Sequence, residues 1–190
     1  PARLTASVRH CNHTNTHKMT GFTRPTGLNT DLFHRPTLDQ RKQIDDRGFF
    51  VLPQRPEEAG YYTYGTPRDG QGQFAHPRML SFIFKLEFEW SKTESRKIGI
   101  GNISLADGAK FPPHHSHKSG LEVDIRPMRK DGLAKPVSYL DEAYDRDATA
   151  KMVAIALGTG CVKRVFFNDL KINNVFKLAG HNDHLHISIE

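Results

Sequence analysis

The chain has 190 residues and a mass of 21.5 kDa, which suits one domain, alone or with an extension, and excludes a multidomain enzyme. Lysine and arginine exceed aspartate and glutamate by 27 − 21 = 6, but basic residues never follow one another in long runs, which argues against a nucleic-acid binder. No apolar run reaches the roughly 18 residues of a membrane-spanning helix.

Residues 1–35 are polar and show no sustained hydrophobic period, so we expect an irregular arm there. The string HCNHTNTH within this arm places four potential metal ligands close together: His10, Cys11, His13 and His17. For this string we favour an irregular polar segment over a metal site.

The two cysteines, Cys11 and Cys161, lie far apart in the sequence. They could form one disulfide in an oxidising compartment or remain separate thiols, and the sequence leaves both open. The chain starts at Pro1 with neither an initiator Met nor an apolar signal-like segment, which indicates a processed or excised piece of a longer protein.

Residues 1–60 are an N-terminal extension without an assigned role, and the main domain is expected over 61–190. Within the extension, a proline start and a glycine stop predict a helix over 36–47, and the apolar string that follows predicts a strand over 49–52. A high density of proline, glycine and tyrosine predicts a loop over 53–72.

In the main domain, MLSFIFKLEFEW predicts a largely buried helix starting near Pro77, with Phe82, Phe84, Phe88 and Trp90 in the core. The elements expected after it are a strand over 98–105, a helix over 146–157, a strand over 162–167, a short helix over 169–179 and a strand over 184–189. Strands and helices do not alternate as in a parallel sheet. We therefore predict an α+β fold with a small central antiparallel sheet flanked by helices.

Histidine is frequent, with 11 in the chain, and most of them gather in two short windows. The first window, residues 112–127, reads PPHHSHKSGLEVDIRP. Its LEVDIR segment alternates apolar and charged residues, so a strand would bury the apolar set and turn Asp124 toward a cleft. A turn at Gly120 can bring His117 back over the same polar face, beside Asp124.

The second window, residues 180–190, reads GHNDHLHISIE and again alternates polar and apolar residues. A strand presents His184 and His186 on one face, whereas a helix would turn them about 200° apart. Two such strands side by side would offer three N/O ligands to one metal ion: His117, Asp124 and His186. His184 would lie one pleat away, with His181 in the preceding loop.

Three protein ligands and an open fourth position are typical of a catalytic zinc site. Zinc lowers the pKa of bound water to about 7 and polarises a carbonyl group. His184, and with it His181, could accept the proton of the attacking water, stabilise the oxyanion or protonate the leaving amine, and spacing does not choose among these roles. His184 and His186 could also exchange roles.

These residues resemble the motifs of a known family. HHSHKSGLEVDI is similar to the H-x-x-H-x-x-G-x-x-x-D box of the penicillin-insensitive murein endopeptidases, and GHNDHLHISI is similar to their closing H-x-x-H-x-H box. FAHPRMLSFIFKL, IGIGNISLADGAKF and KRVFFNDLKI extend the resemblance over roughly residues 61–190. The family belongs with lysostaphin, the D-Ala-D-Ala metallopeptidases and the hedgehog amino-terminal domain, so the resemblance implies a fold of that group.

The resemblance implies a zinc peptidase, periplasmic or secreted, that cuts the D-alanyl to diaminopimelate amide in cross-links between peptidoglycan peptide stems. It carries the zinc-ligand role to His117, Asp124 and His186, and identifies the last histidine of the closing box as a ligand. It carries active-site roles to His184 and His181.

Other positions are less specific. His114 matches the first histidine of its box, and we consider it a candidate outer neighbour of the ligands. His115 has no family role to carry over. We predict no second metal site, because Ala134 stands where a companion histidine to Asp131 would be needed.

Two other functions stay open. A D,D-carboxypeptidase or dipeptidase would need a cation for the terminal carboxylate of its substrate, and Arg126 is the nearby candidate. A zinc-stabilised binding domain would retain metal without hydrolysis, although the spare histidines argue against it. The chain fits part of a longer exported, phage-borne or secreted antibacterial protein.

Overall fold

The computed structural model describes residues 43–54, 56 and 58–190, which fall within one compact unit, Gln40–Glu190. The string HCNHTNTH therefore lies outside the described residues, as does Cys11. Cys161 is a half-buried free thiol.

The part of the predicted 36–47 helix that is described, residues 43–47, forms a bend, a bridge and a turn, so the prediction is wrong there. The Asp45 side chain accounts for this difference, because its Oδ1 accepts hydrogen bonds from the backbone N–H groups of Arg47 and Phe49. Such local bonds compete with helix formation. The strand predicted next is confirmed as β1 (Phe50–Val51), which pairs antiparallel with β3 (Phe74–Ala75).

The main sheet has five strands in the order β2-β4-β5-β7-β6. Their bounds are β2 (Tyr61–Thr63), β4 (Ile98–Ile100), β5 (Glu122–Ile125), β6 (Val162–Phe166) and β7 (Leu185–Ile189). Only the β2 and β4 pair is parallel, and the other three described pairs are antiparallel, so the α+β prediction is confirmed. The prediction of a loop over 53–72 is wrong at β2. This strand forms by pairing with β4, which is distant in the sequence, so local sequence does not reveal it.

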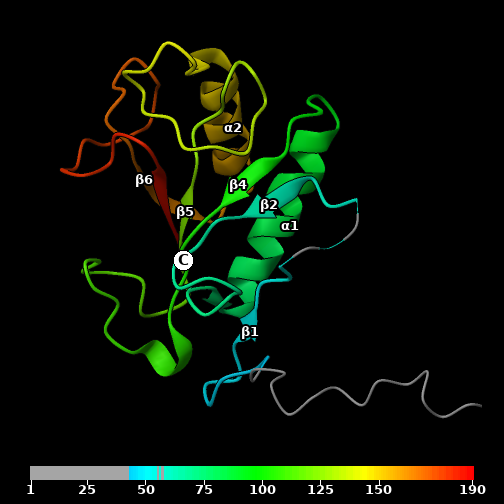
Figure 1. Cartoon of the computed structure of the whole chain (residues 1–190), viewed down its shortest axis with the longest axis vertical. Coiled ribbons are helices and arrows are strands. Elements are labelled where there is room, and N and C mark those ends of the chain that lie inside the picture. The colour runs from blue at the N-terminus through cyan, green and yellow to red at the C-terminus, as the bar shows by residue number, and fades with distance from the viewer. Residues whose placement is uncertain (1–42, 55, 57) are drawn as a thin grey trace, which may run out of the picture. The chain divides into compact units, whose positions relative to one another are not determined.

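Two helices accompany this sheet (Figure 1). α1 (Pro77–Ser91) begins at its proline, and the His76 ring before it accepts a hydrogen bond from the Arg78 N–H. α2 (Arg146–Gly158) begins after Asp145, whose carboxylate caps the Ala148 N–H. Both helices were predicted. A single 3₁₀ turn, η2 (Ala106–Gly108), follows β4.

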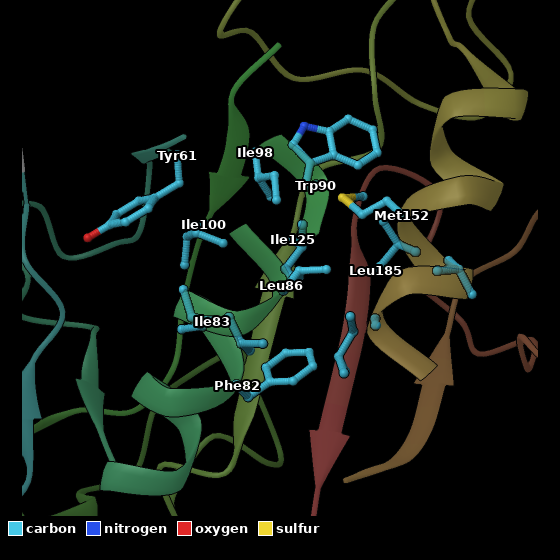
Figure 2. Close-up of a cluster of buried hydrophobic side chains, with 14 of the residues drawn as sticks. Tyr61, Phe82, Ile83, Leu86, Trp90, Ile98, Ile100, Ile125, Met152 and Leu185 are labelled. Atoms are coloured by element: carbon cyan, nitrogen blue, oxygen red, sulfur yellow. The ribbon is translucent and has the colours of Figure 1, made fainter. Parts of the chain in front are cut away.

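The core lies between the helices and one face of the sheet (Figure 2). Alternate strand residues point into it, among them Ile98, Ile125 and Leu185. Leu86 and Trp90 of α1 are buried in the same core, and they lie one helical turn apart on one face of the helix.

Phe82 and Trp90 are buried as predicted, but Phe84 and Phe88 are not. The side chains of Phe84 and Phe88 are 42% and 61% exposed. They fall outside the 3.6-residue stripe that α1 presents to the core, so their predicted burial is wrong.

The short helix predicted over 169–179 is also wrong, because this segment consists of turns and one bridge, Phe166↔Phe176. Phe176 exchanges backbone hydrogen bonds with the β6 edge, donating to the Val165 carbonyl and accepting from the Phe167 N–H. Pairing with a strand edge has satisfied backbone groups that a helix would have satisfied internally.

Among the described residues, no helix combines the length and apolar character needed to cross a bilayer.

Candidate metal centre

The face of the sheet opposite the core carries the polar residues of β5 and β7. Antiparallel pairing places Asp124 directly across from His186. Their neighbours Val123, Ile125 and Leu185 point into the core. Strand alternation therefore leaves both polar side chains on the other face, as the sequence predicted.

His117 reaches this face from the loop before β5. Gly120, at φ +69°, makes the turn between them, and a Cβ there would lie 2.8 Å from the His76 backbone nitrogen. Glu122 holds the loop from the other side, because its carboxylate accepts hydrogen bonds from the His117 N–H and the Ser119 hydroxyl. Glu122 therefore fixes this turn.

One carboxylate oxygen stands at the centre of the site. Asp124 Oδ1 lies 3.1 Å from His117 Nε2 and 3.1 Å from His186 Nδ1. All three side chains are buried. The structure thus brings together His117, Asp124 and His186, although His186 is 62 positions from Asp124 in the sequence.

The donor set fits a bound cation. His117 Nδ1 donates to the Ile103 carbonyl at 3.0 Å, so in the neutral ring Nε2 carries a lone pair and faces a carboxylate that also only accepts. Two acceptors in contact need a proton or a metal ion between them. Separations near 3.1 Å are also in the range for ligand atoms that share a tetrahedral ion. A backbone carbonyl that fixes the outer imidazole nitrogen is a usual support for a metal-binding histidine.

His114 belongs to the same cluster. Ligand atoms of His114, His117 and Asp124 all lie within 4.8 Å of one another, a spacing that could hold a metal ion. The sequence had placed His114 outside the ligand set, whereas this spacing also admits it as a ligand. Asn102 lies against it, with Nδ2 2.9 Å from His114 Nε2. No local motif identified Asn102, which follows β4 and reaches the site through the fold.

The electrostatics of the cluster favour positive charge at its centre. Burial opposes ionisation of Asp124, but hydrogen bonds from His117 and His186 hold the pKa of its carboxyl well below the usual range. Burial lowers the pKa of the His117 imidazole, yet the bond to Asp124 and its negative charge outweigh this and raise the pKa. Burial, with the nearby His117, lowers the pKa of His114.

His184 lies one step further out. Its Nε2 is 3.9 Å from Asp124 Oδ1, and its Nδ1 is 2.9 Å from the Asp183 carboxylate. Because a carboxylate can only accept, Nδ1 carries the proton and Nε2 is the basic nitrogen that faces the centre. The sequence did not single out Asp183, although a carboxylate directly before a candidate base is a readable signal for an orienting partner.

His181 lies beside His184 with ring centroids 4.7 Å apart and the rings tilted, and its Nδ1 donates to the Ala179 carbonyl at 3.0 Å. Burial lowers the pKa of His181, which keeps it neutral near pH 7. Phe166 of β6 closes this side, with its ring centroid 6.0 Å from that of His186.

A groove of about 730 Å³ opens over these residues, so the site is accessible. Its walls come from the two histidine windows and from β6, with the following residues in contact: His114, His115, Phe166, His181, His184 and His186. His115 lines the groove but makes no contact with the Asp124 cluster that would suggest a role.

A family model described as penicillin-insensitive murein endopeptidase matches residues 54–170, more than half of the chain. The chain belongs to this family. A penicillin-insensitive murein endopeptidase of Pectobacterium atrosepticum is 40% identical over 58 residues, which are 30% of this chain and 21% of that protein.

A second family member, from Yersinia enterocolitica, carries the same description and is 25% identical over 164 residues, 70% of this chain and 59% of that protein. The chain therefore spans less than two thirds of the length of these murein endopeptidases. The family match includes the first histidine box and ends before the closing box, so the position of His186 rests on the β5 and β7 register.

Proposed function

We propose that this chain is a zinc-dependent murein endopeptidase that hydrolyses the D-alanyl to diaminopimelate amide in peptidoglycan cross-links. The observation that carries the proposal is the convergence of His117 and His186 on one oxygen of buried Asp124, at the wall of an accessible groove. The family's description names the reaction class. The partner is the peptidoglycan peptide stem, and the place of action is the cell wall, periplasmic or outside the cell.

In this proposal His117, Asp124 and His186 hold the zinc ion, with His114 beside them as an additional ligand or an outer neighbour. Zinc, when bound, would polarise the scissile carbonyl and acidify a water molecule. Asp124 supplies the charge that compensates the cation, and the Ile103 carbonyl fixes the ring of His117. We assign catalysis to residues 61–190 and no role to residues 1–60.

His184 is the proton-transfer group in this proposal. Asp183 orients its ring and fixes its tautomer, so Nε2 can accept the proton of the attacking water and return it to the leaving amine. His181 is neutral and its one N–H is bonded to the Ala179 carbonyl, so its Nε2 can accept a hydrogen bond or a proton beside His184.

A D,D-carboxypeptidase remains the second candidate, because Arg126 shares the polar face with Asp124. The Arg126 guanidinium is partly engaged, since it lies 3.9 Å from the Tyr64 ring centroid and donates to the Ala134 carbonyl at 3.3 Å. This engagement favours the endopeptidase, which needs no terminal carboxylate in its substrate.

The test is digestion of purified cross-linked muropeptide dimers and of free-ended pentapeptide, with products identified by mass. We expect the zinc-loaded protein to release monomers from dimers, and the chelated protein to release none. His184→Ala should retain zinc and lose most cleavage. Release of terminal D-alanine from the pentapeptide, with intact dimers left uncut, would support the carboxypeptidase instead. Retention of zinc without any hydrolysis would support the binding domain.

A further inference from the structure

Tyr62 of β2 and Tyr64, which directly follows this strand, lie on the polar face of the sheet, over Gly99 and Gly101 of the neighbouring segment. Parallel pairing sets Tyr62 beside Gly99 and Thr63 beside Ile100, and the Tyr64 N–H continues the ladder to the Ile100 carbonyl. A Cβ on Gly101 would lie 2.5 Å from Tyr64 Cζ and 2.6 Å from its hydroxyl oxygen. The hydroxyl end of Tyr64 therefore stands directly over Gly101, in space that only a glycine leaves open.

Gly101 is the immediate neighbour of Asp124 across the sheet, and its N–H donates to the Asp124 carbonyl at 2.7 Å. The Tyr64 hydroxyl therefore lies over the residue that is next to Asp124 across the sheet, and the charge of Asp124 acts on it. Arg126 packs on the ring of Tyr64, with its guanidinium carbon 3.9 Å from the ring centroid, and limits how far the ring can move.

The Tyr64 hydroxyl is buried, yet no described residue gives it a hydrogen-bond partner. Buried polar groups are nearly always paired, because an unpaired one loses its bonds to water without compensation. The hydroxyl of Tyr61, three positions earlier, is paired in the usual way and donates to the Pro53 carbonyl at 2.9 Å. Among the described residues, Tyr64 stands out as a donor without an acceptor, next to the candidate metal centre.

This hydroxyl stays protonated in the neutral pH range. Burial raises the pKa of Tyr64 well above its usual value, and the negative charge of Asp124 adds to the effect. It is therefore available as a hydrogen-bond donor and unsuited to act as a base.

We propose that Tyr64 is a catalytic residue whose hydroxyl donates a hydrogen bond to the carbonyl oxygen of the scissile amide, and to the oxyanion that this oxygen becomes. Tyr64 forms no covalent bond and gives up no proton. The acceptor arrives with the substrate, which accounts for an unpaired donor in the free protein. The inference rests on the proposed endopeptidase function, since it assigns Tyr64 to that reaction.

The experiment compares Tyr64→Phe with Tyr61→Phe in the zinc-loaded and chelated chain, measuring kcat and KM on muropeptide dimers, bound zinc and Tm. We expect Tyr64→Phe to lower kcat by on the order of 100-fold, the usual loss when one oxyanion donor is removed. Its KM and zinc content should stay near those of the unsubstituted protein. Its Tm should not fall, even in the chelated protein, because no hydrogen bond is lost.

Tyr61→Phe should behave in the opposite way, with a lower Tm and an unchanged kcat, because its hydroxyl bond is structural. A kcat of Tyr64→Phe within twofold of the unsubstituted value would overturn the inference. A loss of activity accompanied by lost zinc or a lower Tm would also overturn it and assign Tyr64 a structural role. An unsubstituted protein that binds zinc but leaves dimers intact would refute the endopeptidase proposal itself, a result distinct from an active protein that is indifferent to Tyr64.

Discussion

The two faces of the five-stranded sheet are built from the same strands but serve different ends. On the helix side, Val123, Ile125 and Leu185 pack with α1 and α2 into a continuous apolar core. On the opposite side, the alternate residues Asp124 and His186 are buried together, and the Asp124 carboxylate is charged. Burying a charge costs free energy unless it is paired, so stability should come from the first face and chemistry from the second.

Among substitutions on the two faces, the largest effect is expected on the face that carries Asp124 and His186. Asp124→Ala removes the oxygen on which His117 and His186 converge, and should reduce muropeptide cleavage by on the order of 1,000-fold, about 4 kcal/mol of barrier. Zinc content by elemental analysis should fall with it. Asp131→Ala is the matched control, since Asp131 is exposed and pairs with Arg129 away from the cluster. Full cleavage by Asp124→Ala would contradict the metal centre.

On the core face, Leu86→Ala should lower the free energy of unfolding by about 3 kcal/mol, because it leaves a cavity among fully buried side chains. Denaturant titration measures this loss. Under conditions where the variant is folded, its kcat should match that of the unsubstituted protein. A large fall in kcat at full folding would show that the two faces are coupled.

An ion-pair network at the ends of the helices should contribute a smaller, pH-dependent stability. Arg96 donates to Glu94 and to Asp145, the residue that caps α2. The hydrogen bond from Arg96 lowers the pKa of Glu94 to about 2 from 4.5. A lowered carboxyl pKa stabilises the folded state above pH 4.5, and the contribution is lost as the pH falls from there toward 2.

Arg96→Met should therefore be less stable than the unsubstituted chain by about 1 kcal/mol at pH 7, with a difference that shrinks as the solution is acidified toward pH 3. Unfolding free energies measured at several pH values would show it. A difference that stays constant with pH would indicate that Arg96 acts through packing of its side chain.

The smallest effect is expected at Phe88, on the solvent side of α1. Phe88→Ser should change the free energy of unfolding by no more than about 0.5 kcal/mol, because the ring is 61% exposed. It is the exposed counterpart of Leu86→Ala in the same helix. Destabilisation comparable to that of Leu86→Ala would place Phe88 in a contact that the described residues do not show.

Local patterns predicted the elements that carry strong periodicity or caps. The helix near Pro77, the helix after Asp145 and the strands around the two histidine windows all follow from such signals. Predictions failed where a distant partner overrides the local pattern. β2 exists because it pairs with β4, and residues 169–179 form turns that are bridged to β6 at Phe176 instead of a helix.

The same distinction applies to the site. The sequence by itself determined that His117, Asp124, His184 and His186 would lie on a polar face, because strand alternation and the Gly120 turn are local properties. Only the tertiary structure decided that β5 and β7 are neighbours in a register that joins Asp124 to His186. It also placed His114, already a candidate neighbour of the ligands, at ligand distance, and Tyr64 over Gly101 beside Asp124, a contact that no spacing in the sequence encodes.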